Sequence, residues 1–260
     1  MIITFDLGNS DLVINVFEDE NIKATIRVKT DIESSADEYA KTIYELLLAN
    51  RIDYQEITGC VISSVVPPLN GVLKGACMRL LSCEPLFLDK GIKTGLKIIC
   101  DNPSEVGADL IADCVGALYR YKAPAIIVDL GTASKFIVID KKGAFVGVII
   151  APGIKTSKNA LVHNTSKLPN ISMTQPNKVI GKNTQDAMNS GVCFGYASMV
   201  DGMIQRIEDE LGYKTTRILT GGLSKVVYKA VKEEIIYDRD LISYGLLDIY
   251  RRNKENKNEK

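Results

Sequence analysis

Two aspartates with similar flanking residues are the best candidates for chemistry in this chain. Asp6 is followed by Leu7-Gly8-Asn9-Ser10 and Asp129 by Leu130-Gly131-Thr132, and each aspartate ends an apolar run. Glycine in such a turn lets the backbone approach a ligand, and successive turn amides can point at phosphate oxygens. The carboxylate would then hold Mg²⁺, directly or through water. One such motif is more simply a polar hairpin tip, but two copies at matching positions favour a clamp for a polyphosphate.

Two further segments carry weaker signals. Asp109 ends the segment Glu105-Val106-Gly107-Ala108-Asp109 at the expected start of a helix. It is either a general base for an attacking hydroxyl or an acid stabilised by the helix dipole, and the local sequence favours the dipole. Thr220-Gly221-Gly222 follows a short apolar run. The glycine pair leaves room for a flat ring such as adenine, although a plain strand-to-helix turn is the simpler interpretation.

The composition argues against several classes of function. The 260 residues include 32 basic and 32 acidic side chains, which argues against a strongly basic nucleic-acid binder. His163 is the single histidine, so a multi-histidine metal site is excluded. The six cysteines form no Cys-x-x-Cys pair, which indicates reduced thiols in the cytoplasm. No apolar run approaches the roughly 20 residues that a membrane span needs, so we expect no membrane partner and no nucleic-acid partner.

The elements that position the two aspartates repeat along the chain. The patterns predict, in order, strands at 1–5, 12–17 and 22–28, a helix at 35–50, a strand at 59–66, and helices at 73–81 and 106–119. The second series has strands at 125–128, 136–139 and 145–150, helical material including a helix or helix pair at 183–211, a strand at 217–219 and a helix at 241–250.

The repeat predicts an internal duplication within an α/β fold. The order of strand, aspartate, small-residue turn, strand, turn, strand and helix occurs twice, from near residues 1 and 124. We expect an N-terminal half at 1–122 and a C-terminal half at 123–260, with a frayed tail from about residue 251 that has no large apolar side chain.

Eight segments, taken together and in this order, resemble the type III pantothenate kinases. These are Asp6-Leu7-Gly8-Asn9-Ser10, Ser63-Ser64-Val65-Val66-Pro67, Asn102-Pro103 with Gly107-Ala108-Asp109, Asp129-Leu130-Gly131-Thr132-Ala133, Ala151-Pro152-Gly153, Lys167-Leu168-Pro169, Ile180-Gly181-Lys182-Asn183-Thr184 and Thr220-Gly221-Gly222-Leu223. The resemblance implies a duplicated ribonuclease H-like, actin-like ATPase fold with the active site in the cleft between its halves. It also implies transfer of the ATP γ-phosphoryl group to pantothenate, the first step of coenzyme A biosynthesis, by a cytoplasmic homodimer whose dimer contacts lie in the C-terminal half.

The resemblance assigns roles to single positions. Asp109 corresponds to the catalytic base, Asp6 to the acid that supports Mg²⁺, directly or through water, and Asp129 to the acid that holds a monovalent cation, K⁺ or NH₄⁺. The nucleotide side comprises Asp6, Leu7, Gly8, Asn9, Ser10, Asp11, Leu12, Val13, Gly131, Thr132, Gly221 and Gly222. The pantothenate side comprises Cys100, Gly107, Ala108, Asp109, Leu110 and Thr184.

Several positions depart from the family pattern, among them Ser134, Val148 and the three that follow. Leu110 replaces an arginine, Cys100 a tyrosine, and Lys135 a threonine that follows the second phosphate turn. An arginine at position 110 would supply charge-assisted bonds worth about 1.5–3 kcal/mol to the substrate. Three functions therefore stay open: an active pantothenate kinase, a kinase of this fold for another small hydroxyl compound, and a non-catalytic nucleotide-binding regulator. The presence of Asp6, Asp109 and Asp129 together favours an enzyme.

Overall fold

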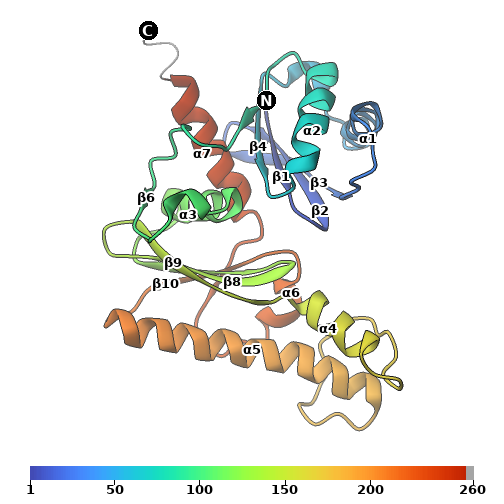
Figure 1. Ribbon diagram of the computed structural model, residues 1–260, viewed down its shortest axis with the longest axis vertical. Helices are drawn as coiled ribbons and strands as arrows, with labels where there is room; N and C mark the ends of the chain where they lie inside the picture. Colours follow the sequence, from blue (N-terminus) through green and yellow to red (C-terminus); the bar gives the residue numbers. More distant parts are fainter. Residues whose placement is uncertain (256–260) are drawn as a thin grey trace. The chain divides into compact units, whose positions relative to one another are not determined.

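The computed structural model describes residues 1–255, which form two compact units (Figure 1). Unit 1 comprises Met1–Leu96, Asn102–Arg120 and the described chain from Ile242 to Glu255, and unit 2 comprises Lys97–Asp101 and Tyr121–Leu241. Within the described residues, no helix is both long enough and apolar enough to cross a membrane.

Unit 1 is built on a five-stranded sheet in the order β3-β2-β1-β4-β5. Its strands are β1 (Ile2–Leu7), β2 (Asp11–Glu18), β3 (Asn21–Lys29), β4 (Gly59–Ser64) and β5 (Leu86–Phe87). β1 pairs antiparallel with β2 and parallel with β4. Because side chains alternate along a strand, Phe5 and Ile62 face one layer of helices while Asp6 and Ser63 lie on the opposite face.

Helices cover both faces of this sheet. The unit contains α1 (Ala36–Ala49), η1 (Tyr54–Glu56), α2 (Pro67–Leu80), η2 (Pro103–Glu105), α3 (Ala108–Arg120) and α7 (Leu241–Glu255). Residues of α1 and α2 pack on the face of Phe5 and Ile62. Residues of α3 and α7 pack against Val61 on the other face. The helix that begins with Asp109 in its first turn therefore covers the sheet face that carries Asp6.

Unit 2 is built on a six-stranded sheet in the order β11-β10-β7-β8-β9-β6. Its strands are β6 (Lys97–Ile98), β7 (Ala125–Leu130), β8 (Ala133–Ile139), β9 (Ala144–Pro152), β10 (Thr216–Thr220) and β11 (Ile236–Tyr237), and its helices are α4 (Ile154–His163), α5 (Thr184–Leu211) and α6 (Ser224–Tyr228). The long α5 runs beside the sheet in Figure 1, and its Val200 and Ile204 pack in one core with Val128 and Phe136.

The two sheets share one topology, which confirms the predicted duplication. In each, the first strand pairs antiparallel with the second and parallel with the fourth, so β7, β8, β9, β10 and β11 correspond to β1, β2, β3, β4 and β5. β6 is an addition at the β9 edge. The turns after Asp6 and Asp129 thus occupy equivalent places.

The observed elements differ from the sequence predictions in a few places. Helix α2 begins at Pro67, because prolines at the first helical positions start a helix as readily as they stop a strand. The segment 183–211 is a single helix, capped by Asn183 and ended by Gly212 at φ 72°. Helix α7, expected in the C-terminal half, belongs to unit 1.

The last helix also extends further than expected, through Glu255. Arg251 pairs with Glu20 and donates to the Asp19 carbonyl at 2.7 Å, and Asn253 donates to the Lys93 carbonyl at 2.9 Å. These contacts order residues 251–255. The prediction of a frayed tail from residue 251, which was based on the lack of large apolar side chains, is therefore wrong for these five residues. The remainder of that predicted tail, 256–260, lies outside the described residues.

Candidate active site

The first candidate phosphate loop is the turn between β1 and β2. The Gly8 amide donates to the Asp11 carbonyl at 3.0 Å, so it is not available to a ligand. Thr30 fixes the other side of the turn, since its hydroxyl donates to the Gly8 carbonyl at 2.7 Å and its amide to the Ser10 carbonyl at 3.0 Å. Asn9 is exposed at the tip. The loop is therefore a fixed scaffold, and its outer residues are the ones placed to meet a phosphate.

Several residues assigned to the nucleotide side hold this loop in place. Leu7 and Leu12 are opposite each other in the β1–β2 pair and are only 1% and 0% exposed, so their side chains pack in the core. Asp11 lies 3.4 Å from Arg27 in an exposed ion pair. Val13 is opposite Asp6 in the same strand pair. The side chains of Leu7 and Leu12 therefore position the turn and leave only their backbone near a ligand.

A buried hydroxyl to which the sequence analysis gave no role lies beside Asp6. Ser63 is the parallel partner of Asp6 at the end of β4. Among the described residues, its Oγ is the buried side-chain oxygen that makes no hydrogen bond. An unmatched buried hydroxyl costs about 1–3 kcal/mol, so a water or ligand atom at this strand end would be stabilising. Part of the signal was available in the sequence, since both strands carry a polar residue near their ends, but the pairing register of the two strands was not.

Asp109 lies half-buried in the first turn of α3. Its Oδ1 accepts a hydrogen bond from the Leu110 amide at 2.9 Å. A Cβ on Gly107 would come within 2.5 Å of that oxygen, so any residue other than glycine at position 107 would require the carboxylate to move. Leu110 is 7% exposed and belongs to the buried part of unit 1, and Ala108 packs at the edge of the α3–α7 core. The geometry suits both interpretations of Asp109, a general base and a helix-start acid.

The second candidate phosphate loop joins β7 to β8. A Cβ on Gly221 would lie 2.5 Å from Asp129 Oδ1, and one on Gly131 would lie 3.5 Å from it, so the carboxylate sits between these two glycines. The Leu223 amide donates to the Leu130 carbonyl at 3.2 Å and ties the turn after β10 to the loop. Unit 2 therefore brings together Asp129, Gly131 and Gly221, as the sequence predicts, and Gly222 follows in the same turn.

Asp129 also has a cationic partner. Lys135 is directly opposite Asp129 in the β7–β8 pair, and its Nζ lies 2.5 Å from Asp129 Oδ2. The side chains are 14% and 13% exposed. Whether Lys135 reached this position or pointed to solvent could not be decided from the sequence.

Strand β10, which leads to Gly221, is anchored to α5 by a buried ion network. Arg217 Nη2 lies 2.8 Å from Glu208 Oε2. Burial raises the pKa of Glu208, but hydrogen bonds from Arg217, Lys214 and Thr215 outweigh this effect and lower the pKa to about 2. Glu208 therefore stays ionised and holds the strand at neutral pH.

The N-terminal end of α4 closes the second loop from the other side. A Cβ on Gly153 would come within 2.1 Å of the Thr132 carbonyl oxygen. The Thr156 hydroxyl donates to that same oxygen at 3.0 Å. The Pro152-Gly153 turn, which the sequence analysis treats as a plain strand end, thus sets the position of Thr132.

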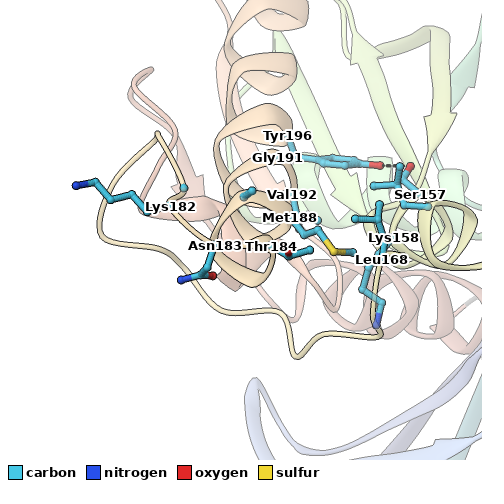
Figure 2. A pocket seen from close by; sticks show the side chains of 13 residues that line it. Ser157, Lys158, Leu168, Lys182, Asn183, Thr184, Met188, Gly191, Val192 and Tyr196 are labelled. Atoms are coloured by element: carbon cyan, nitrogen blue, oxygen red, sulfur yellow. Dashed lines mark hydrogen bonds between the residues drawn. The ribbon is translucent and has the colours of Figure 1, made fainter. Parts of the chain in front are cut away.

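A cavity of about 780 Å³ adjoins α4 in unit 2. Figure 2 shows Ser157 and Tyr196 joined by a hydrogen bond on its wall, with Met188 and Leu168 nearby. The two hydroxyl oxygens are 2.6 Å apart. The Tyr196 hydroxyl also bonds the Pro152 carbonyl at 2.9 Å, which connects the cavity wall to the turn that supports Thr132.

Thr184 lies on the wall of this cavity at the first position of α5. Cys100 follows β6 in the same unit and is partly buried. Gly107, Ala108, Asp109 and Leu110 belong to unit 1. The described residues contain no cluster of three or more histidine, cysteine or acidic side chains able to hold a metal ion by themselves.

Comparison with solved structures identifies the fold. A protein described as a Baf family transcriptional activator from Campylobacter jejuni superposes with a TM-score of 0.59 at 21% identity, covering 97% of this chain and 99% of that one. An activator of 2-hydroxyisocaproyl-CoA dehydratase from Clostridium difficile, solved with bound ADPNP, gives 0.57 at 14% identity over 100% of this chain and 97% of that one. The predicted actin-like, ribonuclease H-like fold class is confirmed.

Sequence comparison identifies the family. Residues 2–206 match the family model described as type III pantothenate kinase. The type III pantothenate kinase of Halalkalibacterium halodurans is 41% identical over 253 residues, which make up 97% of this chain and 100% of that protein. This chain therefore belongs to the type III pantothenate kinase family.

Proposed function

We propose that this protein transfers the γ-phosphoryl group of ATP to the terminal hydroxyl of pantothenate, the first step of coenzyme A biosynthesis. The observation that carries the proposal is the pair of glycine turns after Asp6 and Asp129, at equivalent places in a duplicated fold. Family membership supports the choice of substrates. The six cysteines all carry free thiols, which supports the cytoplasm as the compartment.

We assign the divalent metal ion to Asp6. Mg²⁺ in phosphoryl-transfer sites takes one or two carboxylates and completes its shell with phosphates and water. One carboxylate with the unmatched hydroxyl of Ser63 beside it fits that donor set. When bound, Mg²⁺ neutralises charge on the phosphates, while Asn9 and Ser10 contact their oxygens.

Asp109 is the proposed general base. It orients the acceptor hydroxyl and takes its proton late in the transfer, as a loose transition state requires. The Leu110 amide donates to its carboxylate, and the absence of a side chain at Gly107 leaves room for the carboxylate in that position. That fixed position is what an acceptor hydroxyl needs for in-line attack.

A monovalent cation at Asp129 does not fit the residues present. The Lys135 ammonium already lies 2.5 Å from the Asp129 carboxylate. The ammonium thus already balances the charge of the carboxylate, and a second cation at the same carboxylate would also be repelled by the ammonium. We therefore derive no step from a bound K⁺ or NH₄⁺.

We also propose a homodimer in which α4, α5 and the segment between them form the contact. Val179 and Ile180, just before α5, are 64% and 81% exposed, and Leu161 on α4 is 45% exposed. Such apolar exposure is typical of an association surface. Thr184 and the cavity it lines are the proposed pantothenate contacts of unit 2.

A second candidate function is phosphorylation of a different small hydroxyl compound. Leu110, where the family carries an arginine, is buried and supplies no charge to an acceptor. Cys100 likewise replaces a tyrosine. A panel of alcohols separates the two candidates, because pantothenate turns over only in the first.

The test is ADP release with ATP and pantothenate, with the product identified by ³¹P NMR. Asp109→Asn should bind ATP nearly as tightly as the wild type and lose two decades or more of turnover, about 10²–10⁴-fold. Asp89→Asn, at an exposed acid of unit 1 that also accepts a hydrogen bond from the following backbone amide, is the matched control and should be fully active. Full turnover by Asp109→Asn would overturn the base assignment, and absence of phosphopantothenate with the wild type would overturn the function.

A further inference from the structure

The backbone register places the side chains of Lys135 and Asp129 on the same face of the sheet. Residues directly opposite in an antiparallel pair have their side chains on the same face, about 5 Å apart at Cβ. Asp129 and Lys135 are such a pair. The ammonium reaches the carboxylate at 2.5 Å, and both side chains are about six-sevenths buried. A positive charge is therefore built into this position of the sheet.

The same carboxylate lies at the second phosphate loop. It sits against Gly221 and Gly131, where a Cβ on Gly221 would come within 2.5 Å of Oδ1. Lys135 takes Oδ2. The charge of the ammonium therefore lies at the base of the turn that ends in Thr132, in a partly desolvated setting where it is screened less than in water.

We propose that the Lys135 ammonium supplies the fixed positive charge at Asp129, so that this protein binds nucleotide and transfers the phosphoryl group without an added monovalent cation. The proposal rests on the proposed function for its activity test, and on nucleotide binding alone for its second test. Lys135 acts through Asp129 and the loop, and is thus a positioning residue.

The experiment compares potassium, ammonium and tetramethylammonium chloride at equal ionic strength. Tetramethylammonium is too large to occupy a site between a carboxylate and a turn. We expect the wild-type rate to change by less than about twofold among the three salts. Lys135→Thr should be slower by about ten- to a hundredfold in tetramethylammonium, the effect of losing a charge-assisted contact, and should recover most of that rate in potassium. Lys142→Thr, at an exposed hairpin lysine, should behave as the wild type.

A binding measurement separates this proposal from the proposed function. The affinity for Mg²⁺ and a non-hydrolysable ATP analogue is measured by calorimetry in the same salts. The wild type should bind the analogue with the same affinity in all three salts. The two uncharged variants, Lys135→Thr and Lys135→Met, should bind the analogue more tightly in potassium than in tetramethylammonium. If no salt supports pantothenate turnover, the function fails while this measurement still decides the role of Lys135. The proposal is overturned if wild-type affinity or rate rises about tenfold with potassium, or if neither variant gains a potassium response.

Discussion

Replacement of Gly221 by alanine tests the geometry of the second phosphate loop. Gly221 has φ +95°, and the added Cβ would meet Asp129 Oδ1 at 2.5 Å and backbone atoms of Leu130 at 2.6 Å. The left-handed backbone costs about 1–2 kcal/mol for a residue with a Cβ. Crowding against backbone adds about 1–3 kcal/mol. Gly221→Ala should therefore lower the free energy of unfolding by about 2–5 kcal/mol and displace Asp129.

Gly212→Ala is the matched control for this variant. Gly212 has φ +72° at the end of α5, and no atom lies within 4 Å of its added Cβ. It should show only the backbone cost of about 1–2 kcal/mol and leave nucleotide affinity unchanged. Urea unfolding gives the two stabilities, and calorimetry with a non-hydrolysable ATP analogue gives the two affinities. The reasoning fails if Gly221→Ala is no less stable than Gly212→Ala and binds nucleotide equally well.

Three further outcomes are expected. The pKa of Glu208 is lowered from 4.5 to about 2. The ionised Glu208 therefore stabilises the fold by roughly 3 kcal/mol above pH 4.5, and this stabilisation is lost as the pH falls towards 2. In urea unfolding measured at each pH, Glu208→Gln should lose less stability than the wild type between pH 4.5 and 2. Ser63→Ala removes an unmatched buried hydroxyl and should leave apo stability equal or higher while weakening Mg²⁺-dependent nucleotide binding several-fold by calorimetry. Ile180→Asp places a charge in the proposed dimer contact and should give a monomer in analytical ultracentrifugation, whereas an unchanged mass would remove α5 and its flank from the interface.

Much of the fold followed from local patterns in the sequence. Strands β1, β2, β7 and β8 are apolar runs interrupted by glycine turns, and their repeated order was enough to predict two related sheets. The two-residue strands β5, β6 and β11 were missed because so short a run has no periodicity. The place of α7 in unit 1 was also missed, because it depends on contacts such as Arg251 with Glu20, more than two hundred positions apart.

The candidate site divides in the same way. Asp6, Asp129 and the glycines beside them are sequence neighbours, so their turns could be predicted from spacing. Ser63 and Lys135 could not be assigned, since each meets its aspartate through strand register. Register depends on the pairing of whole strands, which a local pattern does not specify.

Register also gives the two equivalent aspartates different neighbours. Asp6 has Val13 opposite it on the second strand and Ser63 on the fourth, whereas Asp129 has Lys135 and Thr220 at the same two places. The strand neighbours of Asp6 are therefore an apolar side chain and an unmatched hydroxyl, which supports our proposal of the divalent metal ion at Asp6. Asp129 is flanked by an ammonium that already balances its charge. The two carboxylates lie at equivalent places of a duplicated fold, and the residue opposite them on the second strand is valine in one copy and lysine in the other, which supports our proposal that the divalent metal ion binds at Asp6 and not at Asp129.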